Sequence, residues 1–187
     1  FSSGMLLSMF ALQCIFSIQK QKSRHSNFVK ILTAALCFTI AFVLGAYVYL
    51  TFNQYTIWLA NPITQTFLPP HTPISYLISY HFARFLLYYL ISLLIALVFL
   101  IAASRLNRKF QERFFESEEP LLGALAIFTL GHPDWAYGSL HYIAALFLVA
   151  VIGALRLKFI KQTAPFSLYW LWLPLAGLVI LLYELHK

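Results

Sequence analysis

The sequence predicts an all-α integral membrane protein, a polytopic bundle of transmembrane helices that forms a single domain over residues 1–187. Its composition is 61% hydrophobic and 10% charged, whereas about a quarter of the residues in a soluble domain are charged. Several apolar runs approach the ~20 residues that a spanning helix needs. The charged residues gather in short stretches between these runs. Together these features predict about six membrane segments, which include one short helical hairpin. The expected segments are 1–18, 31–52, 76–103, 120–131, 135–155 and 166–183.

The first two segments are expected to cross the membrane as separate helices. Segment 1–18 has no preceding positive charge and no following small-residue cleavage site, so it resembles an anchor rather than a signal peptide. Segment 31–52 has 22 residues without charge. Its Ala41 and Gly45 stand four apart, a spacing that lets a neighbouring helix approach closely. Residues 53–73 contain four prolines and are expected to form an uncharged outer loop.

Segment 76–103 is long for a perpendicular crossing, and His81 and Arg84 are expected at its outer edge. The following residues, 105–119, are good helix formers that mix acidic and basic side chains. They predict that this helix continues into water with local ion pairs on its surface.

Segment 120–131 is the short limb of the predicted hairpin. Ser117, Glu118 and Glu119 are expected to cap its start, and Pro120 suits the first helical position. The eleven residues from Pro120 to Leu130 span about 16 Å as a helix, against about 30 Å of hydrocarbon. This limb therefore requires a thinned membrane, an earlier start, or a turn inside the membrane. After the turn, segments 135–155 and 166–183 are expected to complete the bundle.

The basic residues predict the orientation. Eleven of the thirteen Lys and Arg residues fall in three connecting stretches, 19–30, 104–119 and 156–165. The positive-inside rule places such stretches in the cytoplasm, and so predicts a multi-pass protein of the cell membrane. The same clustering argues against a nucleic-acid partner, despite a net charge of +7.

The hairpin turn, "LGHPDWAYGSLHY", concentrates polar and aromatic residues between two apolar runs. One interpretation is a structural turn, in which glycine ends a helix, proline blocks its continuation and Asp134 caps the next helix. A second is an acid-base or metal site made of His132, Asp134 and His141. We also expect an ion pair between Arg84 and Asp134, because a charge near hydrocarbon is costly without a partner. The alternative for Arg84 is an interfacial arginine that reaches toward water.

No established catalytic or phosphate-binding motif occurs in the chain, and no cofactor is expected. The stretches "ESEEPLLGALAIFTLGHPDW" and "QTAPFSLYWLWLPLAGLVILL", within about residues 116–182, resemble the membrane region of prepilin peptidases. That resemblance implies peptide cleavage by two aspartates at the membrane face. Glu118 stands at the position of the second aspartate, and no aspartate matches the first, so the resemblance implies lost activity.

Three functional classes fit these observations. The favoured one is a non-catalytic membrane component that binds a protein, a helix, a lipid or another copy of itself, with the bilayer as its solvent. The second is a divergent membrane enzyme, either peptidase-like with Glu118 or built on His132, Asp134 and His141. The third is a small transporter or transporter subunit, although the chain shows one broken hairpin and no inverted repeat.

Overall fold

The computed structural model describes residues 8, 10, 11, 13, 14, 22–109, 116, 118–135, 137–160 and 169–186. Within these residues the fold is all-helical, with no strand. This confirms the predicted all-α class. The predicted segment 1–18 and the stretch 110–115 lie largely outside the described residues. Two helical stretches, Asn27–Ala60 and Ile74–Lys109, are long and apolar enough to cross a membrane.

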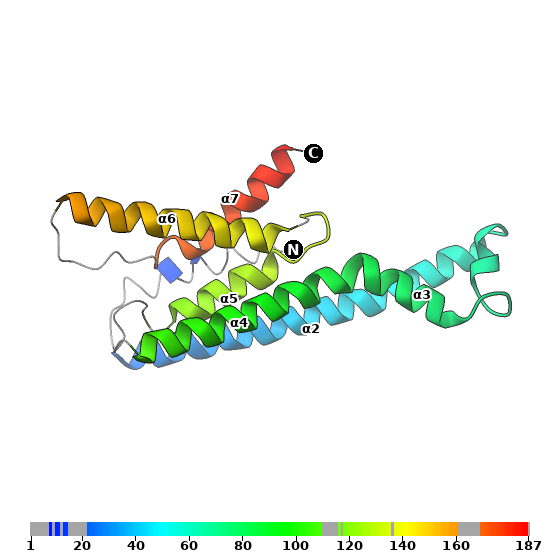
Figure 1. The fold of residues 1–187 in the computed structure, drawn as a ribbon. Coiled ribbons are helices and arrows are strands. Elements are labelled where there is room, and N and C mark those ends of the chain that lie inside the picture. Colours follow the sequence, from blue (N-terminus) through cyan, green and yellow to red (C-terminus); the bar gives the residue numbers. More distant parts are fainter. Residues whose placement is uncertain are drawn as a thin grey trace.

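A long helical hairpin forms one side of the molecule (Figure 1). Its first arm is helix α2, Lys22–Ala60. Its second arm consists of α3, Ile74–His81, one turn of π-helix, Phe82–Leu86, and α4, Leu87–Lys109. The hydroxyl of Tyr47 donates to the carbonyl of Ile78 at 3.1 Å and links the two arms.

The first arm is longer than the sequence predicted. Helix α2 was expected over 31–52, but it starts at Lys22 and continues to Ala60. Residues 53–60 contain neither proline nor glycine, so nothing in the backbone stops the helix before Pro62. The predicted outer loop 53–73 is therefore partly helical, and it also includes the 3₁₀ turn Thr64–Phe67.

The end of the hairpin has a small core of its own. We call residues 53–83 the head. Trp58, Leu68 and Leu77 are buried there, with Tyr55 and Tyr80 packed against them. This cluster is separate from the main core and lies where the hairpin projects beyond the other helices (Figure 1).

Three further helices form the rest of the body. Helix α5 is Glu119–Thr129, α6 is Gly138–Ile160 and α7 is Trp172–Leu185. Pro120 therefore occupies the second position of α5 instead of the predicted first. The sixth predicted segment began at 166, six residues before α7.

Helix α6 starts three residues later than predicted. Tyr137 has a φ of 65°, in the left-handed region, so the helical conformation cannot extend back through it. The first backbone bonds of α6 instead run to the carbonyl of Tyr137 from the N–H groups of Leu140 and His141. Asp134 lies within the preceding turn and not at the predicted capping position.

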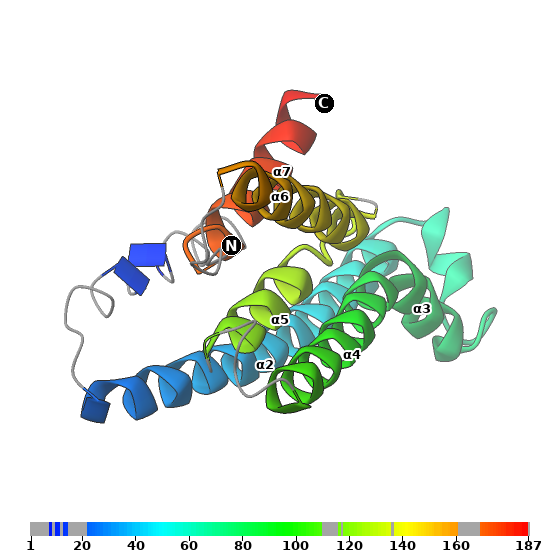
Figure 2. The ribbon, with the colours of Figure 1, turned by 60° about the vertical axis from the view of Figure 1, so that its left-hand side comes forward.

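Helix α5 occupies the centre of the molecule. It packs most extensively against α4 and also contacts α2, α6 and α7. Figure 2 shows it enclosed between the hairpin and the α6/α7 pair. Every residue of α5 except Leu121 is buried.

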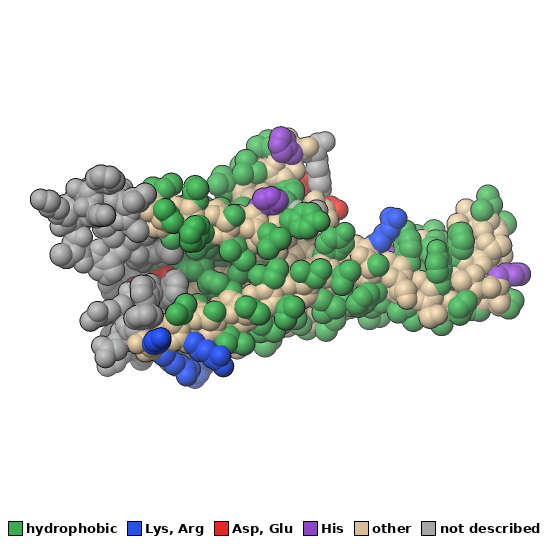
Figure 3. Space-filling model, in the orientation of Figure 1, with side chains coloured by type: hydrophobic (Ala, Val, Ile, Leu, Met, Phe, Trp, Pro, Cys, Tyr) green, Lys and Arg blue, Asp and Glu red, His purple; other side chains and the backbone are tan. Residues whose placement is uncertain are grey.

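A group of exposed basic side chains marks one end of the body, which we call the basic end. Arg105, Arg108 and Lys109 close α4 there, and Lys30 lies near the start of the apolar part of α2. Figure 3 shows a group of Lys and Arg side chains at this end, whereas Arg84, which is also exposed, directly follows the head in the chain. The opposite end of the body, where α5 turns into α6, is called the far end below.

Candidate functional site

Glu119 is a buried carboxylate at the first turn of α5. Its side chain is only 2% exposed. Oε2 accepts a hydrogen bond from the indole Nε1–H of Trp172 at 3.0 Å, and Oε1 accepts one from the backbone N–H of Glu116 at 3.3 Å. A carboxylate near a helix N-terminus is favoured by the helix dipole. Glu119 therefore joins the start of α5 to the start of α7.

Glu118 immediately precedes Glu119 and is also buried, at 4% exposure. Its side chain makes no capping hydrogen bond to α5. The sequence predicted that the acidic residues here would be solvated and would cap the helix. For Glu118 and Glu119 that prediction is wrong, because α5 begins inside the body and carries both carboxylates in with it.

The first turn of α7 is held by hydrogen bonds from other segments. The hydroxyl of Tyr142, a fully buried residue of α6, donates to the carbonyl of Trp172 at 2.8 Å. The amide Nε2 of Gln13 donates to the carbonyl of Tyr169. We call Gln13, Glu118, Glu119, Tyr142, Tyr169 and Trp172 the inner cluster.

A glycine permits the close approach of the elements that carry this cluster. A Cβ atom at Gly123 would lie 2.5 Å from Cε1 of Phe99 on α4 and 2.7 Å from Cζ3 of Trp172 on α7. Neither ring can move easily, because the two rings pack on each other with centroids 5.6 Å apart. Glycine at this position lets α4 and α7 meet across α5.

At the far end, the turn after α5 faces the side of α4. The ring of His132 lies edge-on to Tyr89, with centroids 6.2 Å apart, and 5.1 Å from the ring of Trp135. A Cβ at Gly131 would lie 2.7 Å from Cβ of Ser92. The turn is therefore level with residues 89–92 of α4, and so nearer the basic end than Arg84.

The three residues predicted as an acid-base or metal site do not converge. Nδ1 of His132 lies 3.9 Å from Oδ2 of Asp134 and accepts a hydrogen bond from the Asp134 N–H at 3.2 Å. Nδ1 of His141 lies 2.8 Å from the hydroxyl of Tyr183 on α7. The described residues contain no group of three His, Cys, Asp or Glu side chains placed to hold a metal.

Arg84 and Asp134 contact different partners in the structure. The guanidinium of Arg84 lies 5.0 Å from the ring centroid of Tyr80, in a cation–π arrangement. The carboxylate of Asp134 faces His132. The predicted ion pair between Arg84 and Asp134 stays a prediction, and the contacts of Arg84 do not support it.

Several contacting residues were not singled out in the sequence. Ser92 and Ser139 form a buried hydrogen bond of 3.2 Å between α4 and α6. Trp135 was expected to anchor the turn at the interface, but its hydrogen bond of 3.1 Å to Glu184 of α7 was not predicted. Trp172, Tyr142 and Gln13 were also missed. The sequence feature that could have indicated the contacts of Glu119 was the pair of acidic residues at the start of an otherwise apolar helix, since a charge in that position needs a partner.

Comparison of the chain with protein-family models, with curated proteins and with solved structures finds no match. The resemblance of residues 116–182 to prepilin peptidases therefore receives no support from these comparisons.

Proposed function

We propose that this chain is a multi-pass integral membrane protein that acts as a non-catalytic component and binds another membrane protein or a second copy of itself. Its basic stretches, 19–30, 104–119 and 156–165, lie in the cytoplasm in this proposal. The short α5 and the pair α6 and α7 join the two long arms to form the membrane body.

The exposure of the long helices supports the membrane assignment. Within the most apolar windows of the two candidate spans, only 28% and 22% of the residues are buried inside the molecule. The core helix of a soluble protein would bury most of such a window. These faces are instead covered with exposed large apolar side chains, which the hydrocarbon of a bilayer accommodates.

The main support for a non-catalytic role is that the buried polar groups form hydrogen bonds between different parts of the bundle. Glu119 bonds Trp172, Tyr142 bonds the carbonyl of Trp172, and Ser92 bonds Ser139. His141 and Trp135 likewise contact side chains of α7. Each of these groups connects two helices or, for Trp135, a turn and a helix, so these side chains serve to hold the bundle together.

Photocrosslinking in native membranes tests this proposal. A photoreactive residue is placed at exposed apolar positions of α2, Phe38 or Val48, and of α6, Phe147 or Leu148. We expect an adduct of discrete protein mass from one of these two faces, and the same adduct in the Glu119→Gln variant. Lipid adducts alone at all four positions in folded protein would contradict a partner-binding role.

A membrane enzyme is the second candidate function, because Glu118 and Glu119 are adjacent and both buried. Two neighbouring carboxyl groups away from water do not both ionise readily, and such a pair can act as acid and base. Cells that contain the wild type or Glu119→Gln can be compared by proteome-wide identification of protein N-termini. A hydrolase acting on peptides predicts termini that disappear in the variant, whereas the non-catalytic proposal predicts identical sets.

A further inference from the structure

The head contains no acidic side chain and no Lys or Arg, although much of its surface is exposed. Residues 31–83 contain no Asp, Glu, Lys or Arg. Ile63 is 79% exposed at the tip, and other large apolar side chains are exposed on both arms. These are Ile57, Leu59, Phe67, Ile74, Tyr76 and Ile78. An exposed apolar patch without charge is typical of a surface that meets lipid or another protein.

Several polar groups in the loop of the head are satisfied within the head, although Nε2 of His81, lower on the second arm, is buried without a hydrogen-bond partner among the described residues. The hydroxyl of Thr64 donates to the carbonyl of Trp58, and the hydroxyl of Thr72 donates to the carbonyl of Thr66 at 2.8 Å. The side-chain oxygen of Asn61 accepts from the N–H of Ile63 at 3.0 Å. A loop that lies where little water is present must satisfy its backbone N–H and C=O groups with hydrogen bonds inside the protein.

An aromatic cluster lies between this tip and Arg84. The ring of Trp58 contacts the rings of Phe67, Tyr76 and Tyr80, with centroids 5.6, 6.2 and 5.5 Å away. Trp and Tyr concentrate at the boundary between hydrocarbon and headgroups. This composition fits the interfacial layer of a bilayer, in which an arginine such as Arg84, stacked on Tyr80, can extend toward the headgroups.

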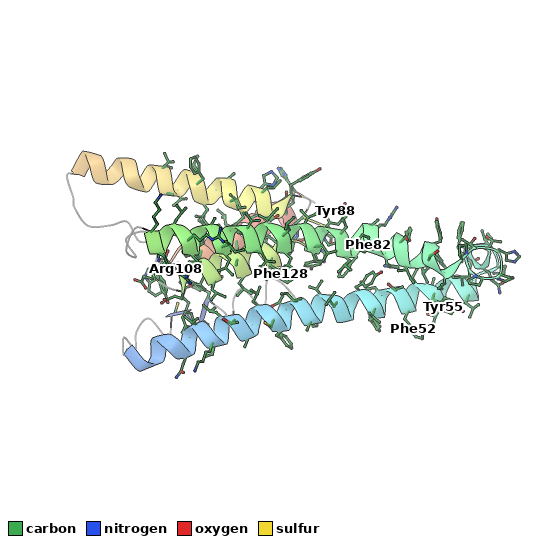
Figure 4. The ribbon with its side chains drawn as sticks, turned by 60° about the horizontal axis from the view of Figure 1, so that its bottom comes forward. Phe52, Tyr55, Phe82, Tyr88, Arg108 and Phe128 are labelled. Atoms are coloured by element: carbon green, nitrogen blue, oxygen red, sulfur yellow. The ribbon has the colours of Figure 1, made fainter. Side chains whose placement is uncertain are left out.

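The length of the hairpin agrees with this placement. The candidate span Asn27–Ala60 has 34 residues, or about 51 Å of helix at 1.5 Å per residue. A bilayer with its headgroup layers is about 40–45 Å thick. A tilt of about 35°, within the range of transmembrane helices, fits the helix into this thickness. Figure 4 shows Tyr55 and Phe82, which belong to the head, and Phe52, directly before it, far along the hairpin from Arg108.

We propose that the head is an interfacial lipid-binding element, which docks in the headgroup layer of the leaflet opposite the basic end. Its aromatic cluster lies toward the acyl boundary, and the exposed apolar side chains of the tip lie among the headgroups. The head carries no Lys or Arg, and the neighbouring Arg84 is a single cation that stacks on Tyr80. Zwitterionic lipid is therefore sufficient for this contact, without the anionic lipid that clusters of basic residues attract.

Nitroxide accessibility in phosphatidylcholine nanodiscs tests the proposal. The native cysteines are replaced by alanine, and single cysteines are spin-labelled at Ile63 and, on the other arm, at Ile74. Phe38, an exposed residue in the middle of α2, and Arg108, at the basic end, serve as membrane and aqueous controls. Collisions are measured with oxygen, which concentrates in lipid, and with a water-soluble nickel chelate.

We expect the ratio of oxygen to nickel collisions at both head positions to lie several-fold above the ratio at Arg108 and below the ratio at Phe38. Addition of anionic lipid leaves these ratios unchanged. Ratios equal to that of Arg108 would overturn the proposal, because the head would lie in water. Exclusion of both reagents would also overturn it, since a protein or a second copy would then cover the head. A dependence on anionic lipid would contradict the zwitterionic contact.

Discussion

The carboxylate of Glu119 and the indole of Trp172 form a buried contact between residues 53 positions apart. The indole N–H is the side-chain donor to Oε2, and both residues are almost fully excluded from solvent. Removal of one partner strands the other, and a buried group left without its hydrogen bond costs about 1–3 kcal/mol.

Trp172→Phe should therefore lower the free energy of unfolding by about 1–3 kcal/mol. The measurement is reversible unfolding in mixed micelles with increasing denaturing detergent. Trp170→Phe is the matched control, because Trp170 is 47% exposed and should change stability by less than about 0.5 kcal/mol. Equal effects of the two substitutions would show that the Glu119 contact contributes nothing.

Arg84 and Asp134 allow a direct test of a pairing that charge alone predicted. Arg84→Gln removes the cation over Tyr80, and Asp134→Asn alters the contact with His132. Because these partners differ, we expect the two changes in unfolding free energy to add within about 0.5 kcal/mol. A larger coupling in the double variant would establish the ion pair that the sequence predicted.

At the scale of helices, the sequence predicted the existence of the elements better than their ends. The apolar runs identified α2, α4, α5, α6 and α7, because hydrophobic length is a local property. The extension of α2 through residues 53–60 was missed because the four following prolines suggested a loop over the whole stretch. The burial of Glu118 and Glu119 was missed because it depends on the distant start of α7, which covers them.

Gly123 of α5 lies against side chains of both α4 and α7. Gly123→Ala should destabilise the fold by about 1–3 kcal/mol, because the new methyl group overlaps the rings of Phe99 and Trp172. Gly177→Ala is the control, since a Cβ there meets nothing within 4 Å. That change should be neutral or stabilise α7 by up to about 1 kcal/mol, as alanine is the better helix former. A neutral Gly123→Ala would mean that the three helices are less tightly packed than described.

At the scale of the whole molecule, the positions of the charges and of the apolar surface agree on one arrangement. A group of exposed basic residues lies at one end of the body, and the head, which has only Arg84 beside it, projects at the other, with apolar faces between them. The composition and the order of the charged residues predicted this separation of basic and uncharged ends, because both can be read directly from the sequence. The way in which the inner cluster joins the N-terminal segment, α5, α6 and α7 could not be predicted, since no local pattern pairs Gln13 with Tyr169 or Tyr142 with Trp172.

Substituted-cysteine labelling in intact cells tests most directly the proposed placement in the membrane. With the native cysteines replaced, single cysteines are introduced at Arg108, at the basic end, and at His71, on the exposed tip of the head. A membrane-impermeant thiol reagent should label His71→Cys in intact cells, and Arg108→Cys only after the membrane is permeabilised. Labelling of Arg108→Cys in intact cells would contradict a membrane-embedded chain with its basic end in the cytoplasm.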